Sequence, residues 1–365
     1  MDTNWSAFCA VCASRDLGGE LRIRGELGAT EHLRLCTACF GFLADALRVA
    51  AAEGADCSLC GDGRGVHTVA LLPRAASNPG NRPPAGYLLC HACLTWTRDL
   101  IDGESLTRWA RRGEGDGPAG EWPHPRIAGI CAIGLDAGET PAIAAAAEAV
   151  GAPFSTHGTA PAAASVNERA IYLVRAAPDR SATAFVASLP PERRHQVAIV
   201  CAPGQEDDAA AALIQGAGET LAAPLSRQQV LGAIDRIARD GAPRRDPRTG
   251  LPWYPVVSRF GLPCHGLRVE SPGTAFETVL LLRRFLRGYD AVGGDGEGNA
   301  LVLVYCDPDE LDAVLRRFGR LLGEAATVNV VAYAEAAAEG HPDAPRRRLP
   351  QAAAAYFGTA FTRAS

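Results

Sequence analysis

The segment that decides the fold of the N-terminal region begins with Cys57-Ser-Leu-Cys60 and ends with Cys90-His-Ala-Cys93. Both ends are Cys-x-x-Cys pairs, and the sequence upstream contains two more such pairs. Each pair places two thiolates on a tight turn at ~2.3 Å from a metal ion, and two pairs complete a closed tetrahedron. Eight of the twelve cysteines therefore predict structural zinc sites in a reducing compartment rather than disulfides.

The order of the pairs along the chain predicts two zinc ions. We expect the first four cysteines to bind one ion and the last four to bind the other: Cys9, Cys12, Cys36, Cys39 and Cys57, Cys60, Cys90, Cys93. An apolar stretch at helical spacing follows each second pair. A knuckle, a hairpin and a helix that starts at the last ligands form the treble-clef arrangement. The spacing also leaves open a cross-braced alternative, in which Cys9, Cys12, Cys57 and Cys60 share one ion.

The second unit resembles the zinc-binding domain of the ClpX unfoldase. The resemblance lies in Cys57-Ser-Leu-Cys60-Gly and Tyr87-Leu-Leu-Cys90-His-Ala-Cys93, with Val69 and Leu71 between them. The first unit is a looser copy, so the region looks like a tandem duplication. Because the family domain mediates dimerisation and the docking of adaptors or substrates, the resemblance implies protein contacts rather than catalysis. The alternative is that zinc only stabilises a region too small for a large core.

Length and composition indicate a folded protein of several domains, with 365 residues, 47% of them hydrophobic and 21% charged. The sequence has no apolar run of membrane-spanning length and no leader, so we expect a cytoplasmic protein without a membrane partner. All basic residues are arginine and alanine is abundant, which is typical of a GC-rich bacterial genome. The net charge is −3 over residues 1–125, −3 over 126–240 and +1 over 241–365, so nucleic acid is not an expected partner.

Clusters of glycine and proline divide the chain into three expected domains. Residues 113–125 have no apolar periodicity and are predicted to be a linker. A second break lies at residues 240–247. The expected domains are a tandem zinc-binding region of α+β units over 1–112, an α/β domain over 126–240 and an α+β domain over 245–365.

The middle domain alternates apolar strand-like runs with alanine-rich helical stretches, which predicts a parallel sheet. The expected strands are 127–133, a short segment near 153–154, 170–174, 197–201 and 219–222. Their order and length resemble a response-regulator receiver domain. That family needs paired carboxylates for Mg²⁺, a phosphoacceptor aspartate and a lysine, where this chain has Asp136, Arg175 and Ala223. We therefore expect a pseudo-receiver that is not phosphorylated and whose helices supply a dimer or docking surface.

The C-terminal domain resembles the GGDEF, or diguanylate cyclase, family in two motifs. Asp246-Pro-Arg-Thr-Gly-Leu-Pro252 is similar to the entry of that domain, and Leu286-Arg-Gly-Tyr-Asp-Ala-Val292 is similar to the segment before its signature loop. The signature itself falls on Gly296-Glu-Gly-Asn-Ala300, where only the first glycine matches. The first strand offers Glu270 alone as a metal ligand, and the segment from 270 to 287 is too short for the nucleotide-binding turn and helix. The resemblance thus implies a degenerate domain without a working active site.

The same resemblance implies one ligand site, because Arg287 and Asp290 stand at the family's spacing for the inhibitory site that binds cyclic di-GMP. A guanidinium can pair with guanine O6 and N7 or with a phosphate, and a carboxylate can accept from guanine N1 and N2. A second arginine from the following helix completes the family's site, and Arg316, Arg317 or Arg320 could serve. The alternative is an ordinary salt bridge.

These expectations combine into a non-catalytic bacterial signalling or adaptor protein. Its partners are expected to be proteins, a second copy of the chain included, and cyclic di-GMP is the expected small ligand. One alternative is a structural scaffold without any small ligand, and another is a residual cyclase that binds GTP. Of the cysteines outside the pairs, Cys131, Cys201 and Cys306 are predicted to be core residues, and Cys264 with His265 is predicted to lie in a loop without a role.

Overall fold

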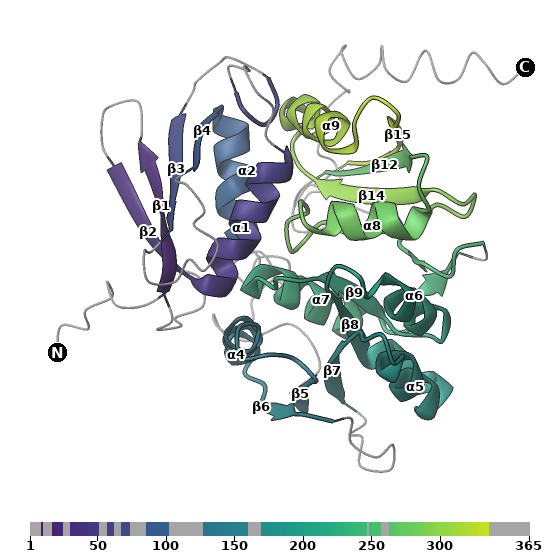
Figure 1. The fold of residues 1–365 in the computed structure, drawn as a ribbon. Coiled ribbons are helices and arrows are strands. Elements are labelled where there is room, and N and C mark those ends of the chain that lie inside the picture. Colours follow the sequence, from purple (N-terminus) through teal and green to yellow (C-terminus); the bar gives the residue numbers. More distant parts are fainter. Residues whose placement is uncertain are drawn as a thin grey trace, which may run out of the picture.

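The structure is a computed structural model that describes residues 9, 17–24, 30–50, 57–61, 67–73, 85–101, 127–159, 169–246, 248–256 and 263–335. It contains three units (Figure 1). The N-terminal unit, in purple and blue, lies beside the C-terminal unit, in green and yellow, and the middle unit, in teal, lies below both. The linker expected over 113–125 lies outside the described residues. No helix in the described part of the chain is long and apolar enough to cross a membrane.

The N-terminal unit repeats one pattern, a β-hairpin followed by a helix. The first copy consists of β1 (Leu17–Arg24), β2 (Thr30–Cys36) and α1 (Thr37–Ala50), and the second of β3 (His67–Pro73), β4 (Ala85–Leu89) and α2 (His91–Ile101). The hairpins join edge to edge because β1 pairs with β3, which places Leu21 opposite Leu71. The resulting sheet has the order β2-β1-β3-β4. Both helices start at the second cysteine pair of their copy, as the sequence predicts.

The middle unit is built on a parallel sheet with the order β6-β5-β7-β8-β9, which is the doubly wound order with the second strand at one edge. Its strands are β5 (Gly129–Ile133), β6 (Phe154–His157), β7 (Ala170–Arg175), β8 (Val197–Cys201) and β9 (Glu219–Ala222). Its helices are α4 (Thr140–Ala149), α5 (Ser181–Ser188), the 3-10 helix η4 (Pro191–Gln196), α6 (Glu206–Ile214) and α7 (Arg227–Asp240). The prediction of a parallel sheet with these five strands is confirmed.

The C-terminal unit has a strand-helix-strand-strand-helix-strand pattern on an antiparallel sheet with the order β13-β14-β12-β15. These elements are β12 (Cys264–Glu270), α8 (Ala275–Arg283), β13 (Ala291–Gly294), β14 (Ala300–Tyr305), α9 (Pro308–Leu322) and β15 (Thr327–Ala334). A small hairpin of β10 (Arg244–Arg245) and β11 (Pro252–Trp253) precedes them. The segment from 270 to 287, expected to be too short for the family's nucleotide-binding turn and helix, contains the nine-residue helix α8. A capping box of Thr274 and Glu277 starts this helix directly after the strand.

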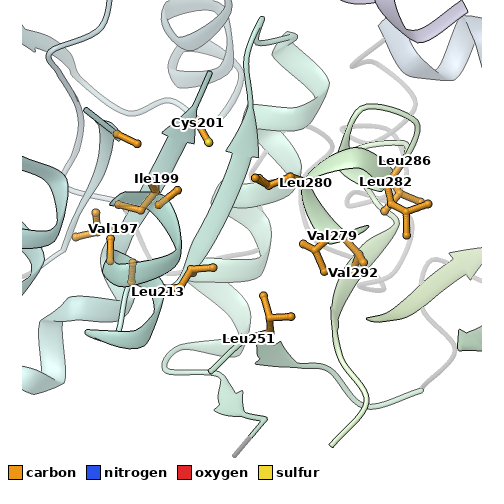
Figure 2. Packing of buried hydrophobic residues seen from close by; sticks show 14 of the residues in the cluster. Val197, Ile199, Cys201, Leu213, Leu251, Val279, Leu280, Leu282, Leu286 and Val292 are labelled. Carbon is orange, nitrogen blue, oxygen red and sulfur yellow. The ribbon is translucent and has the colours of Figure 1, made fainter. Parts of the chain in front are cut away.

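The hydrophobic cores run across the boundaries between units. One cluster joins Val197 and Ile199 on β8 to Val279 and Leu282 on α8, and Figure 2 shows Leu280 between the two groups. A second cluster joins both cysteine-rich copies to Phe285 and Ala313 of the C-terminal unit. The three sequence domains therefore pack as one body with shared apolar contacts.

A close backbone approach holds α7 against the C-terminal unit. A side-chain carbon at Gly232 would lie 1.8 Å from the carbonyl oxygen of Gly288, so only glycine fits at this crossing. Beside it, the Arg236 guanidinium donates to the carbonyl oxygens of Gly288 and Asp290 at 2.9 and 3.0 Å. The carboxylate of Glu219, at the start of β9, is fully buried between Arg236 and Arg283.

The cysteines outside the pairs are mostly core residues, as predicted. Cys201 and Cys306 are buried, and burial raises the pKa of each thiol to about 12. Cys131 is partly exposed and accepts a hydrogen bond from Ser155. The expectation of a loop at Cys264 and His265 is wrong, because both residues begin strand β12 and are buried.

Candidate metal centre

The structure brings the last four paired cysteines together in one buried cluster. The sulfur atoms of Cys57, Cys60, Cys90 and Cys93 all lie within 4.8 Å of one another, and those of Cys60 and Cys90 are 3.5 Å apart. All four side chains are at most 6% exposed. We call this set cluster 2.

Two short turns give cluster 2 its shape. In the first, the amide of Gly61 donates to the carbonyl of Cys57 at 2.9 Å, and Gly61 adopts a positive φ of 78° that suits glycine. In the second, α2 begins directly after Cys90, and the Cys90 amide donates to the sulfur of Cys57 at 3.2 Å. Backbone donors aimed at a sulfur atom favour the thiolate form that a metal requires.

The remaining described paired cysteines form a second group. The sulfur atoms of Cys9, Cys36 and Cys39 lie within 4.8 Å of one another and are buried, and the Cys39 amide donates to the sulfur of Cys36 at 3.4 Å. We call this group cluster 1. Cys12, its expected fourth ligand, lies outside the described residues. Since Cys9 groups with Cys36 and Cys39, the structure has the sequential pairing and contradicts the cross-braced alternative.

The donor set of cluster 2 fits zinc. Hydrogen bonds from Cys90 and Cys93 lower the pKa of Cys57, while the bond to Cys57 raises the pKa of Cys90 to about 11 and also raises that of Cys93. Four thiolates held this close together in a buried site repel one another, so a site that uses all four as ligands requires a cation. Four buried sulfur ligands at this spacing are typical of a structural zinc site without an open position for a substrate.

Helix α2 connects cluster 2 to the C-terminal unit. The Nη1 atom of Arg317, on α9, donates to the sulfur of Cys93 at 3.3 Å, and the guanidinium lies 4.8 Å from the ring centre of Trp96. The indole Nε1 of Trp96 donates to the carbonyl oxygen of Phe285 at 2.9 Å. Arg317 and Trp96 are both buried, so these contacts are shielded from solvent.

The predicted nucleotide residues Arg287 and Asp290 pair with each other inside this interface. The Asp290 carboxylate accepts from Nε and Nη2 of Arg287 at 3.0 and 3.2 Å, and Nη2 of Arg287 also donates to the carbonyl oxygen of Tyr305. Asp99, on α2, covers the pair: it lies 3.6 Å from Nη1 of Arg287 and accepts from the hydroxyl of Tyr289 at 2.9 Å. Arg287 is only 7% exposed and Asp290 3%.

The other two predicted nucleotide residues lie in different surroundings. Arg317 contacts Cys93, as described above, and Arg316 lines a cleft of about 560 Å³ between α9 and the turn of cluster 2. The cleft is also lined by Cys60, Gly61 and Arg320. The structure therefore does not gather the four predicted residues around one open site.

The edge of the parallel sheet where receivers hold their metal contains an internal ion pair. Arg175, the last residue of β7, contacts the carboxylate of Asp136 at 3.2 Å and also that of Glu139. Glu139 is 5% exposed, and burial raises its pKa despite the neighbouring charge of Arg175. The sequence identified Asp136 and Arg175 but missed Glu139, whose position after the first strand was the available signal.

The hairpin that aligns with the GGDEF signature contains a similar pair. Nε of Arg268, on β12, lies 2.9 Å from the Asp295 carboxylate, and Nη1 lies 3.1 Å from that of Glu297. The Asp295 carboxylate also accepts from the backbone and side chain of Asn299 at 3.0 Å. These carboxylates thus serve to hold the hairpin between β13 and β14.

Comparison of the chain with protein-family models, curated proteins and solved structures gives no match. The residues described above are therefore the basis for any function.

Sequence reasoning missed the contacts of Trp96 and Asp99, although their spacing after Cys93 was an available signal. Residues 93, 96 and 99 recur every third position and thus share one helix face.

Proposed function

We propose that this chain is a non-catalytic signalling or adaptor protein, made of tandem treble-clef zinc units, a pseudo-receiver and a degenerate GGDEF domain. The observation that carries this proposal is that arginines of the chain itself neutralise carboxylates at the sheet edge that resembles the receiver metal site and in the hairpin on which the GGDEF signature falls. Arg175 does so in the middle unit and Arg268 in the C-terminal unit.

In the middle unit the arginine stands where the resemblance to receivers predicts a phosphoacceptor aspartate. A receiver binds Mg²⁺ through hard oxygen ligands and transfers a phosphoryl group to that aspartate. Here the guanidinium of Arg175 offers hydrogen-bond donors and a positive charge to Asp136 and Glu139 instead. Because the Arg175 guanidinium already neutralises these carboxylates, binding of a metal ion to them is disfavoured. This contact supports a fixed structural role for the middle unit.

In the C-terminal unit the arginine occupies the first strand next to the hairpin. A cyclase needs carboxylates free to bind two metal ions beside the nucleotide phosphates. Asp295 is instead held by Arg268 and by Asn299, with a side chain that is 3% exposed. The contact supports the interpretation that this hairpin retains the shape of the family's loop without its chemistry.

Protein contact is the function that remains, and the N-terminal sheet offers a surface for it. Its helices pack on one face, where Leu21 and Val69 are buried. The opposite face carries Glu20, which accepts from Arg22 at 2.6 Å and contacts His32 at 2.7 Å. Leu88, on β4, is 45% exposed. Because a single exposed apolar side chain is normal on a protein surface, the docking role rests on the resemblance of the second unit to the ClpX zinc-binding domain.

The proposed lack of catalytic activity is tested on the full chain. We expect no mass increase after incubation with acetyl phosphate and Mg²⁺, and no product from GTP with Mg²⁺ or Mn²⁺. A phosphoryl adduct on Asp136, or any cyclic dinucleotide formed from GTP, would overturn it. Light scattering measures the molar mass of the protein and so tests whether it forms a homodimer. If the protein is a scaffold without a small ligand, its mass should be the same with and without cyclic di-GMP.

A second candidate function is the sensing of cyclic di-GMP, which rests on the spacing of Arg287 and Asp290 and requires a rearrangement that opens the buried ion pair these residues form with each other. Calorimetric titration of the full chain provides the test. Binding at roughly 100 μM that is lost in Arg287→Ala and retained in Arg244→Ala, which changes an exposed arginine outside the predicted site, supports sensing. No binding, or equal binding by both variants, leaves the scaffold as the better interpretation.

A further inference from the structure

Three residues on one face of α2 bind the N-terminal unit to the C-terminal unit. Cys93 accepts from Arg317, Trp96 donates to the carbonyl of Phe285, and Asp99 accepts from Tyr289. We call these three contacts the α2 clamp. Their spacing of three residues places them on adjacent turns of the same face.

The α2 clamp is buried and polar, which makes its groups dependent on one another. Trp96 is 4% exposed, Arg317 is 6% and Tyr289 is 6%. If one of these contacts broke while α2 stayed docked, the carbonyl of Phe285 or the guanidinium of Arg317 would lose a partner that the interior does not replace. A buried polar group without a partner costs about 1 to 3 kcal/mol, so the contacts form or break together.

Cluster 2 determines whether α2 can present this face. The helix starts at His91, between two of the ligands, so a metal bound to Cys90 and Cys93 fixes the position and the rotation of its first turn. Eleven residues are too few for a stable helix in isolation. A small cysteine-rich unit of this kind draws its folding energy from its metal.

The charge of the site favours the same coupling. Four thiolates around one Zn²⁺ leave a net charge of about −2. Arg317 places its guanidinium on the ligand Cys93 and is held in the interior by the ring of Trp96. This arginine from another unit therefore stabilises the charged, metal-bound form of the cluster, and its own burial is favoured only while that charge is present.

We propose that cluster 2 is a metal-dependent interdomain lock: zinc at Cys57, Cys60, Cys90 and Cys93 keeps α2 docked, and loss of zinc releases the α2 clamp. Release withdraws Asp99 from Arg287 and Tyr289, which exposes Nη1 of Arg287 to an anionic ligand while Asp290 still binds Nε and Nη2. The inference rests on the zinc binding in the proposed function. It adds that metal occupancy controls access to a surface in another unit.

Hydrogen exchange of the full chain tests the lock. Zinc is removed with a chelator and then restored, and exchange is followed over residues 283–292 and over α9. We expect faster exchange there without zinc, together with residues 85–101, and recovery when zinc is added back. Faster exchange confined to the N-terminal unit would overturn the lock but leave zinc binding intact. Absence of zinc at cluster 2 in the purified protein would overturn both.

A matched pair of variants tests the role of Arg317 as a positioning residue. Arg317→Gln removes the charge beside Cys93, while Arg244→Gln removes the charge of an exposed arginine on β10, outside the lining of the cleft at cluster 2. We expect Arg317→Gln to lose one zinc ion to a competing chelator at about 10- to 100-fold lower chelator concentration, with the other ion unaffected. Equal retention of zinc by the two variants would contradict the lock.

Discussion

Arg317 donates a hydrogen bond to the sulfur of Cys93 at 3.3 Å, across 224 positions of sequence. The contact makes a ligand of the N-terminal metal site part of the packing of the C-terminal unit. It also assigns Arg317 to the cysteine cluster, whereas the resemblance to cyclases implied a role at a nucleotide. The contacts between the two units continue along α2, because Asp99, on the same helix as Cys93, lies 3.6 Å from Nη1 of Arg287.

The first prediction concerns the metal content. Purified protein should contain about two zinc ions per chain, because the thiols form two separate groups. Cys57→Ser should reduce the content to one, and Cys9→Ser should remove the other ion independently. Elemental analysis of the two variants and of the double variant checks this. A single substitution that removes both ions would show that the two groups share a metal or fold as one.

The second prediction concerns the hydrogen bond from Trp96. Trp96→Phe keeps an aromatic ring against Arg317 but removes the Nε1 donor to the Phe285 carbonyl. A buried carbonyl then lacks its partner, so we expect a loss of about 1 to 3 kcal/mol in the free energy of unfolding, measured with urea. Trp253→Phe is the control, because Trp253 is partly exposed and its ring stacks with Arg244, a contact that phenylalanine retains. Similar losses in both variants would contradict the prediction.

The third prediction concerns Arg175. Arg175→Ala leaves Glu139 buried without its cation, which should cost about 3 to 5 kcal/mol at pH 7. Burial already raises the pKa of Glu139, and removing the guanidinium raises it further. A raised folded pKa contributes stability at low pH that is lost as the pH rises, so the deficit relative to wild type should shrink between pH 7 and pH 5. Urea unfolding at both pH values checks this, and a deficit that is constant with pH would contradict it.

The elements that the sequence predicted well are those with strong local signals. Cysteine spacing placed α1 and α2 directly after their ligands, and the apolar runs located all five strands of the parallel sheet. The helix α9 has local signals of the same kind, because Pro308 stands at its start and Gly323 directly follows its end.

The contacts between elements that are far apart in the sequence could not be predicted from it. No local feature of the sequence indicates that β1 pairs with β3, because the free edge of each hairpin could equally have faced solvent. The buried partners of Glu219 come from α7 and α8, and an ion pair between distant arginines and a glutamate leaves no periodic signal. The helix α8 was not located from the sequence, although the capping box of Thr274 and Glu277 was an available local signal.

The last prediction concerns the pH dependence of the interface at Glu219. Although burial raises the pKa of this carboxyl, the charges of Arg283 and Arg236 outweigh burial and hold it below its usual range. A lowered folded pKa contributes stability that is present above the unfolded value of about 4.3 and is lost as the pH falls through the folded pKa. Glu219→Gln leaves two buried arginines without their carboxylate, so we expect a loss of about 3 to 5 kcal/mol at pH 7 that narrows below about pH 4.

Urea unfolding of wild type and Glu219→Gln at pH 7, 5 and 3.5 measures that narrowing. Glu297→Gln is the matched control, because Glu297 also pairs with an arginine but its side chain is 62% exposed. Since solvent screens exposed pairs, the control should lose less than about 1 kcal/mol at any of these pH values. If the two variants lose equal stability at pH 7, Glu219 does not hold the middle and C-terminal units together, and the shared apolar core must do so instead.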